Sequence, residues 1–206
     1  MVTPTPERSV FVVDDDEAAL DSLVTLLRSD GLNPRGFSSA DSFLQTVTPQ
    51  SRGCVISDVR MPGLDGVQLI KLLKSMNSLL PVIVITGHAD VTVAVQAMKS
   101  GASDFIEKPF ESELILRLVR SSLEANDEAM DADAKRTRVL RRIESLTARE
   151  RQVLDLVMDG ASNKVIAAGL NISPRTVEIY RANVMSKMRA DSVSELVRMT
   201  LSAGAA

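Results

Sequence analysis

Polar side chains stand at the ends of several short apolar runs in this sequence. Three aspartates follow SVFVV, one aspartate follows CVIS, a threonine ends PVIVIT, and a lysine follows DFIE. An aspartate is rarely buried without a partner, so a carboxylate directly after a buried run needs an explanation. The residues at these run ends are Asp14, Asp15, Asp16, Asp58, Thr86 and Lys108.

Carboxylates crowded together repel one another unless a cation joins them, and oxygen ligands suit Mg²⁺. A lysine and a hydroxyl nearby suit a phosphoryl group, which has three acceptor oxygens. The chemistry that uses the whole set is transfer of a phosphoryl group to a carboxylate, with Asp58 as the nucleophile. Mg²⁺ held by Asp15, Asp58 and one backbone carbonyl would neutralise charge, while Lys108 and Thr86 would contact the phosphoryl oxygens.

Each residue also has a structural interpretation when it is taken alone. Residues 14–16 could be a solvated helix start, Asp58 a turn residue, and Lys108 an exposed loop lysine. The coincidence of all of them at strand ends favours a functional site.

The elements that must position these side chains alternate along the first 125 residues. Expected strands cover residues 9–14, 35–37, 54–58, 81–86 and 104–107. Expected helices cover residues 17–29, 39–47, 66–76, 91–101 and 111–123. Five β/α units predict a doubly wound α/β domain, flavodoxin-like, with a five-stranded parallel sheet. Ligands bind beyond the carboxyl ends of such strands, which is where the polar residues lie.

No strand pattern follows Leu146, and four helices in a small all-α bundle are expected instead. Their predicted caps are Thr147, Ser162, Ser173 and Ser192. Gly169 would cost about 1 kcal/mol relative to alanine inside the second of these helices and could mark an early end. We therefore expect a domain over residues 1–123, a charged helical linker over 124–145, and a helical domain over 146–206. A flexible charged tether is the alternative for the linker.

Composition limits the function classes. The 206 residues carry a net charge of −3, with 45% apolar and 25% charged residues. Residues 1–125 hold 11 basic and 16 acidic side chains, and the remainder holds 13 and 11, which permits a cation site in the first part and a nucleic-acid partner in the second. A single cysteine, no apolar run of membrane-spanning length and no signal peptide predict a cytoplasmic protein.

Smaller signals have plain interpretations. Cys54 is expected to be a buried apolar residue, Met76 and Met98 to be core residues, and His88 to be a loop residue. The absence of Trp argues against stacking on single-stranded bases.

Residues 9–123 resemble a response-regulator receiver domain. The strings VVDDD, ISDVRMPGLDG, VIVITGHAD and DFIEKPF stand in the order and at the spacing of that family. The resemblance implies that Asp58 accepts a phosphoryl group, that Thr86 and Phe105 are the switch residues, and that Lys108 pairs with the phosphate. It implies a cis bond between Lys108 and Pro109. It also implies Mg²⁺ or Mn²⁺ bound by Asp14, Asp15, Asp58 and the carbonyl of Arg60.

Residues 146–206 resemble a LuxR/FixJ-type helix-turn-helix. The match runs through LTARERQVLDLVMDGASNKVIAAGLNISPRTVEIYRANVMSKM, with a supporting helix over 162–170 and a recognition helix over 174–187. Val177, Val184 and Met188 form an inward stripe, and Tyr180 flanks it, which leaves a polar surface to read the major groove. Expected DNA contacts are Arg175, Thr176, Glu178, Ile179 and Arg181, with Asn163, Lys164 and Lys187 near phosphates. Glu178 departs from many relatives, which carry lysine there; it can accept from cytosine but repels phosphate.

Both parts together resemble two-component regulators of the NarL/FixJ class, with a lean toward the FixJ branch. The resemblance implies a regulator of transcription, expected to be an activator, that a cognate sensor histidine kinase phosphorylates. The new charge of about −1.5 to −2 would draw Thr86 inward and shift the face built from residues 91–100. Val95 and Lys99 are expected at a homodimer contact there, and the dimer would bind a two-fold promoter site in double-stranded DNA. RNA polymerase is a further possible partner, and no membrane is expected.

Three rival functions are also compatible with the sequence. An aspartyl-phosphate hydrolase would usually carry a second aspartate two residues after the nucleophile, where this chain has Arg60. For this reason we expect that the protein is not an enzyme. A DNA-binding protein with a non-signalling receiver, and a protein-interaction output without DNA, are the other two.

Overall fold

The computed structural model of the chain describes residues 8–87 and 91–205, so His88 lies outside the described residues. The chain divides into two compact units, Met1–Met130 (unit 1) and Asp131–Ala206 (unit 2). Unit 1 has two hydrophobic cores and unit 2 has one. The helix α5, Ser112–Glu144, contributes residues to a core of unit 1 and to the core of unit 2. Since α5 runs to Glu144, residues 124–144 of the expected linker are helical.

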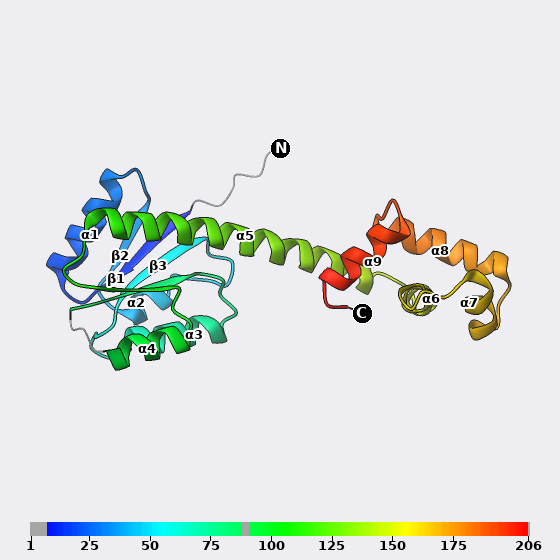
Figure 1. Cartoon of the computed structure of the whole chain (residues 1–206), viewed down its shortest axis with the longest axis horizontal. Helices are drawn as coiled ribbons and strands as arrows, with labels where there is room; N and C mark the ends of the chain where they lie inside the picture. Colours follow the sequence, from blue (N-terminus) through cyan, green and yellow to red (C-terminus); the bar gives the residue numbers. More distant parts are fainter. Residues whose placement is uncertain (1–7, 88–90, 206) are drawn as a thin grey trace. The chain divides into compact units, whose positions relative to one another are not determined.

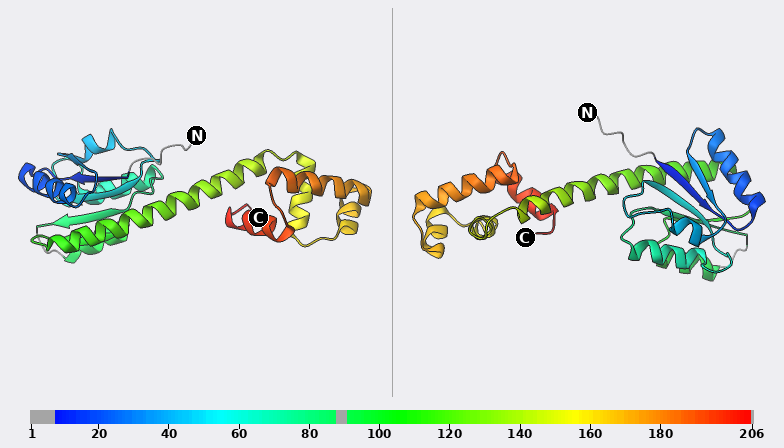
Figure 2. Two further views of the ribbon diagram at one scale, coloured as in Figure 1. Left: turned by 90° about the horizontal axis from the view of Figure 1, so that it is seen from above. Right: turned by 180° about the vertical axis from the view of Figure 1, so that it is seen from behind.

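Unit 1 is a parallel sheet flanked by helices (Figures 1 and 2). Its strands stand in the order β2-β1-β3-β4-β5, as a doubly wound fold requires. The strand bounds are β1 Ser9–Val13, β2 Pro34–Phe37, β3 Gly53–Asp58, β4 Val82–Thr86 and β5 Asp104–Glu107. The five-stranded parallel sheet predicted from the alternating pattern is confirmed, and each strand that ends in a polar residue delivers it to the same edge.

Alternate side chains of each strand point to opposite faces of the sheet, and two cores result. Val10 and Val12 of β1 belong to the core that α1 (Glu17–Ser29) and α5 cover, with Leu27 and Ile115 fully buried. Phe11 and Val13 belong to the opposite core, where Phe43 and Leu73 are buried. The helices on that side are α2 Ala40–Leu44, α3 Gly66–Ser75 and α4 Val91–Ser100.

Unit 2 consists of the C-terminal part of α5 and four short helices around one core. Their bounds are α6 Ala148–Met158, α7 Asn163–Leu170, α8 Pro174–Met188 and α9 Val193–Ser202. Each begins after the side-chain cap that the sequence predicts: Thr147, Ser162, Ser173 and Ser192 each accept a hydrogen bond from a backbone N–H in the first turn. Val177, Val184 and Met188 are buried in the core and Tyr180 is half-buried, so the inward stripe of the third helix is confirmed.

Helix α7 runs to Leu170, as the expected span of 162–170 predicted, and Asn171 in the left-handed conformation caps it, so Gly169 does not end it early. One expectation fails. Met98 is not a core residue, because 48% of it is exposed on α4, and Ala97 is the buried residue of that helix. Met76 is half-buried against the core, and Cys54 is fully buried as expected. No helix among the described residues is both long and apolar enough to span a membrane.

Candidate functional site

Lys108 joins two carboxylates at the carboxyl edge of the sheet. Its ammonium nitrogen Nζ lies 2.8 Å from Oδ2 of Asp14 and 3.0 Å from Oδ1 of Asp58. The side chain of Asp14 is 9% exposed, that of Asp58 13% and that of Lys108 30%. The sequence placed these three residues at the ends of separate runs, and the structure brings them into direct contact. We call these three residues the acid cluster.

The sheet positions the acid cluster through neighbouring strands. β1 and β3 are paired, with Val13 opposite Ser57, so Asp14 and Asp58 emerge side by side. Lys108 follows β5, and its backbone N–H donates to the carbonyl of Thr86 at 2.7 Å. The bond from Lys108 to Pro109 is cis, as the family resemblance implied.

Gly66 explains how the loop after Asp58 fits. A Cβ atom at Gly66 would lie 2.5 Å from the carbonyl oxygen of Asp58, so a larger residue would displace that loop. The Gly66 N–H donates to the carbonyl of Val59, which closes the turn that carries Arg60. Asp65 caps α3 in a capping box with Gln68, so the loop between β3 and α3 is held at its far end.

The second oxygen of each clustered carboxylate is also bonded. Oδ1 of Asp14 accepts from the Asp16 N–H at 3.0 Å, and Oδ2 of Asp58 accepts from the Arg60 N–H at 2.8 Å. The aspartate run thus divides by role, because Asp16 caps α1 and only Asp14 joins the cluster. Asp15 is exposed, and no hydrogen bond or ion pair to it occurs in the described part of the chain.

Electrostatics keep Lys108 charged. Burial alone would lower the pKa of the Lys108 ammonium, but its hydrogen bonds and its attraction to Asp14 and Asp58 raise that pKa above the ordinary 10.5. Lys108 is therefore a cation at neutral pH. Cys54 has no comparable role, since burial raises the pKa of its thiol to about 12 and keeps it protonated.

The donor groups at this edge are those of a site for a hard cation. Asp14 and Asp58 offer carboxylate oxygens on the two sides of one ammonium group, and Asp15 adds an exposed carboxylate next to them. Oxygen donors without nitrogen or sulfur are the set that Mg²⁺ or Mn²⁺ prefers. The described residues nevertheless contain no group of three or more His, Cys, Asp or Glu side chains already gathered as a metal site. The donor chemistry fits a hard cation, whereas the carboxylates are arranged around Lys108.

The expected switch residues lie on the two strands that follow β3 in the sheet, Thr86 on β4 and Phe105 on β5. Thr86 ends β4 and is 3% exposed, and Ile85 beside it is paired with Asp58 across the sheet. Phe105 on β5 stands opposite Val84 and is half-buried against the core. Thr86 is therefore linked to the acid cluster through the pairing of β4 with β3 and through its bond to the Lys108 N–H, and Phe105 lies on the strand that leads to Lys108.

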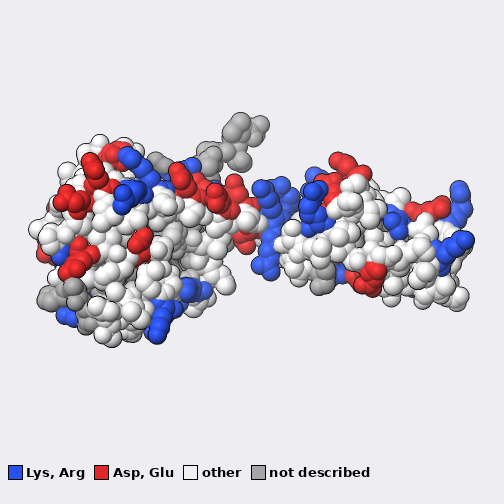
Figure 3. All heavy atoms as spheres, viewed as in Figure 1, with Lys and Arg blue, Asp and Glu red and all other residues white. Residues whose placement is uncertain are grey.

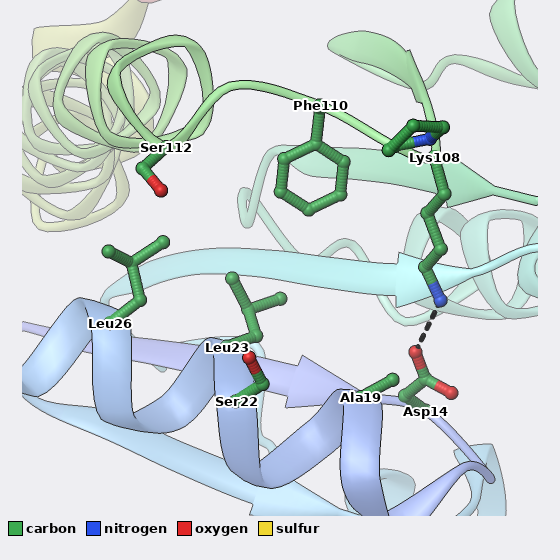
Figure 4. A pocket seen from close by; sticks show the side chains of 9 residues that line it. Asp14, Ala19, Ser22, Leu23, Leu26, Lys108, Phe110 and Ser112 are labelled. Atoms are coloured by element: carbon green, nitrogen blue, oxygen red, sulfur yellow. Dashed lines mark hydrogen bonds and ion pairs between the residues drawn. The ribbon is translucent and has the colours of Figure 1, made fainter.

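A pocket of about 310 Å³ borders the acid cluster between α1 and the loop before α5 (Figure 4). Lys108 and Asp14 stand at one end of it, and Leu23, Leu26 and Phe110 give it apolar walls. The cluster is thus reachable from the surface on the α1 side.

The polar face of α8 is the candidate nucleic-acid surface in unit 2. Arg175, Glu178 and Ile179 are exposed on it, and Ile179 is 57% exposed although it is apolar. Thr176 and Arg181 are half-exposed, with the Thr176 hydroxyl 2.8 Å from that of Ser173. In the preceding helix Lys164 is exposed and Asn163 is half-exposed. On the face seen in Figure 3, basic side chains gather over the α5 part of unit 2, and side chains of both charge signs are interspersed over its other helices.

Lys187 has a partner that sequence reasoning missed. Its Nζ lies 2.6 Å from Oε2 of Glu150, a residue that is only 4% exposed. The same oxygen accepts from the Thr147 N–H in the capping box of α6. The hydrogen bond from Lys187 and those with Thr147 lower the pKa of Glu150 below the ordinary 4.5, although burial opposes the shift. The capping box predicted from the sequence is confirmed, but the link from α6 to α8 could not be read from local spacing.

Helix α4 carries an exposed apolar stripe. Val91 is 77% exposed, Val95 45% and Met98 48%, and their spacing of four and three residues puts them on one face. Lys99 is exposed next to Met98. The outward position expected for Val95 and Lys99 agrees with this arrangement.

Comparison with known families covers both units. The family described as response regulator receiver domain matches residues 10–120, and the family described as bacterial regulatory proteins, luxR family, matches residues 144–200.

Individual relatives cover nearly the whole chain. The transcriptional regulatory protein FixJ of Bradyrhizobium diazoefficiens is 48% identical over 97% of this chain and 98% of its own length. FixJ of Azorhizobium caulinodans is 51% identical over 96% and 93%, and the response regulator protein TmoT of Ectopseudomonas mendocina is 41% identical over 94% and 88%.

Solved structures give the same picture. The response regulator StyR superposes with a TM-score of 0.85 at 38% identity, over 95% of this chain and 98% of that one. Full-length FixJ from B. japonicum gives a TM-score of 0.58 at 47% identity, over 97% and 98%.

Proposed function

Because this chain belongs to the two-component response regulators of the NarL/FixJ class, with a receiver domain and a LuxR-type DNA-binding domain, we propose that phosphorylation of Asp58 switches it. The chain is a regulator of transcription, and its relatives carry the names of transcriptional regulators rather than of enzymes. We further propose that the receiver controls DNA binding. The proposed limits are 1–123 for the receiver, 124–145 for the linker and 146–206 for the DNA-binding domain. We place the protein in the cytoplasm.

The observation that carries the proposal is the bridge from Lys108 to Asp14 and Asp58. A carboxylate oxygen of Asp58 attacks the phosphorus of a phosphohistidine on the cognate sensor kinase. The new O–P bond forms as the N–P bond breaks, and the imidazole of the kinase leaves with the electron pair. Lys108, held as a cation, pairs with the phosphoryl oxygens and offsets the added negative charge.

Asp14, Asp15, Asp58 and the carbonyl of Arg60 are the residues that would hold Mg²⁺ or Mn²⁺. When bound, the ion supplies charge neutralisation for the transferring group. Asp15 supports this assignment because its carboxylate is exposed beside the cluster and has no partner among the described residues.

The phosphoryl group adds a charge of about −1.5 to −2 at neutral pH. We propose that the Thr86 hydroxyl donates a hydrogen bond to that group and that the Phe105 side chain changes its rotamer when Thr86 moves. These movements would alter the surface formed by α4 and β5. The exposed stripe of Val91, Val95 and Met98, with Lys99 beside it, would then become a homodimer contact. A two-fold dimer would present two copies of α8 to a promoter site.

In the DNA complex, α8 would lie in the major groove. Base and backbone contacts are proposed for Arg175, Thr176, Glu178, Ile179 and Arg181, with Asn163 and Lys164 on phosphates. Lys187 uses one of its three N–H donors on Glu150 and keeps two for a phosphate. Recruitment of RNA polymerase and activation of the promoter complete the proposal.

Asp58→Asn tests the acceptor. The full chain is treated with Mg²⁺ and a small-molecule phosphodonor, and acid-labile phosphate is measured together with affinity for DNA selected from genomic fragments. Loss of labelling in Asp58→Asn is expected, while Asp21→Asn, an exposed aspartate of α1, should label normally. Undiminished labelling of Asp58→Asn would refute the assignment. Equal DNA affinity of the unmodified chain with and without phosphodonor would show that the receiver does not control DNA binding.

A further inference from the structure

Asn126 is a buried polar residue on α5, at the edge of the sheet opposite to the acid cluster. It is 1% exposed, and its side chain uses both ends. Oδ1 accepts from the Gly53 N–H at 2.9 Å, and Nδ2 donates to the carbonyl of Leu79 at 2.8 Å. No sequence pattern predicts this pair of hydrogen bonds, because Asn126 stands in a charged segment interpreted as a linker.

The position of Asn126 follows from the helix repeat. Ile115, Val119 and Leu123 form the buried stripe of α5 against the sheet, and Asn126 is three residues further on the same face. An amide in place of the next apolar residue satisfies two backbone groups that the sheet leaves open. A buried polar residue with both ends bonded fixes one geometry more strictly than an apolar residue would.

Gly53 makes this contact possible. Its φ of +138° is a conformation that residues with a Cβ rarely adopt, and a Cβ there would lie 1.8 Å from the carbonyl oxygen of Ser9. The backbone at the start of β3 is thereby turned so that its N–H meets Asn126. Asp127 adds ion pairs next to it, at 2.6 Å to Arg8 and 3.6 Å to Arg52. We call Asn126 and Asp127, with these partners, the helix clamp.

The clamp ties α5 to the strand that carries Asp58. Gly53 is the first residue of β3 and Asp58 is the last. At the other end, α5 begins at Ser112, four residues after Lys108, which is bonded to Asp58. Strand β3 and helix α5 are therefore connected at both edges of the sheet, and unit 1 ends at Met130, about one helical turn after Asn126.

We propose that Asn126 is a positioning residue for the phosphorylation switch: it fixes the place and rotation at which α5 leaves the receiver. This rests on the proposed function, since it states how a change at Asp58 reaches the segment of α5 that continues into unit 2. When α5 is bonded to β3 through Asn126, a displacement of β3 also moves α5. Without the Asn126 bonds, the C-terminal part of α5 does not follow the displacement of β3. Asn126→Ala should then separate phosphorylation from control of DNA binding.

The test uses the full chain with and without phosphodonor. The ratio of DNA affinities with and without phosphodonor, called the gain, measures the coupling between Asp58 and the DNA-binding domain. Allosteric couplings typically change affinity by about 5–150-fold. Asn126→Ala is expected to label at Asp58 at the normal rate and to lose most of that gain. Ser121→Ala, an exposed serine of the same helix, is the matched control and should keep it. Hydrogen exchange at the Gly53 amide reports directly whether the clamp is open.

An unchanged gain in Asn126→Ala, with fast exchange at Gly53, would overturn the proposal. So would a parallel fall in Asp58 labelling, because the residue would then act on the acid cluster itself. If Asn126→Ala does not fold, the isosteric Asn126→Asp decides the question, since it keeps the acceptor for the Gly53 N–H and removes the donor to the Leu79 carbonyl. A reduced gain then supports the proposal and an unchanged gain refutes it. Absence of any gain in the unmodified chain would instead refute the proposed function.

Discussion

Lys108 shows how one cation permits two carboxylates at the end of a sheet. Asp14 and Asp58 each keep one oxygen on this ammonium and the other on a backbone N–H. Without Lys108 the two carboxylates would repel each other, and the little solvent that reaches these partly buried groups would screen that repulsion poorly. The residue that is proposed to bind phosphate thus also stabilises the resting receiver.

The variant Lys108→Met should lower the free energy of unfolding by about 1–3 kcal/mol at pH 7, because it leaves two partly buried carboxylates without their cation. Urea unfolding followed by circular dichroism measures the effect. The pKa of Lys108 is raised in the folded state, so its stabilisation is complete below 10.5 and is lost as pH rises through the raised value. The difference between the two proteins should therefore shrink above pH 10.5.

The matched control is Lys71→Met, which removes an exposed lysine of α3 and should change stability by less than about 0.5 kcal/mol. Equal stability of Lys108→Met and the unmodified chain would show that the bridge contributes nothing to the resting fold.

At the scale of elements, the helices of unit 2 are held by an ion pair between the buried Glu150 carboxylate and the exposed Lys187 as well as by their apolar core. Glu150 belongs to the first turn of α6 and Lys187 to the last turn of α8, so their bond fixes the two ends against each other. The exposed face of α8 depends on this packing for its orientation.

Glu150→Gln should destabilise unit 2 by about 1–3 kcal/mol at pH 7, because the Lys187 ammonium loses its charged partner. The pKa of Glu150 is lowered in the folded state, so its contribution is present above the ordinary value of 4.5 and disappears as pH falls through the lower folded value. Hydrogen exchange of α8 amides measures the free energy, and the variant's deficit should vanish in acid. Glu144→Gln, an exposed glutamate at the end of α5, serves as control. A deficit that persists at low pH would contradict the ion-pair explanation.

Lys164→Ala tests the DNA surface through its supporting helix. A lysine on a phosphate contributes to every DNA sequence alike, so binding should weaken uniformly and the slope of log affinity against log salt should fall by about 0.9. Fluorescence anisotropy at several salt concentrations gives the slope. Arg28→Ala, at an exposed position on α1, should leave it unchanged. An unaltered slope in Lys164→Ala would remove this residue from the interface.

At the scale of the whole molecule, the proposed switch depends on self-association. The stripe of Val91, Val95 and Met98 exposes apolar surface on a helix next to β5, and no segment of the described chain is seen to cover it. Burying that stripe in a dimer would remove it from water, at about 25 cal/mol for each Å² of apolar area.

Val95→Glu should weaken dimerisation of the phosphorylated chain by about tenfold or more, because the two-fold axis brings the new charge close to its own copy. Sedimentation equilibrium with and without phosphodonor measures the association constant. Gln96→Glu places the same charge one residue further, on another face of α4, and should have little effect. Equal weakening by both variants would place the dimer contact elsewhere.

The sequence determined the elements and the residue types at the sheet edge. Strand runs, helical periodicity and caps such as Asp65, Thr147 and Ser173 act over a few residues, so their effects can be predicted locally. Run ends at Asp14, Asp58 and Lys108 predicted one site because parallel strands share an edge.

Only the tertiary structure decided which side chains became partners. Lys108 reaches Asp14 across 94 residues, Glu150 reaches Lys187 across 37, and Asn126 reaches Gly53 across 73. Such pairs depend on how the completed elements pack, and no periodic signal in the chain records them. The same holds for Met98, which the sequence alone would put in the core and which the packing of α4 leaves exposed.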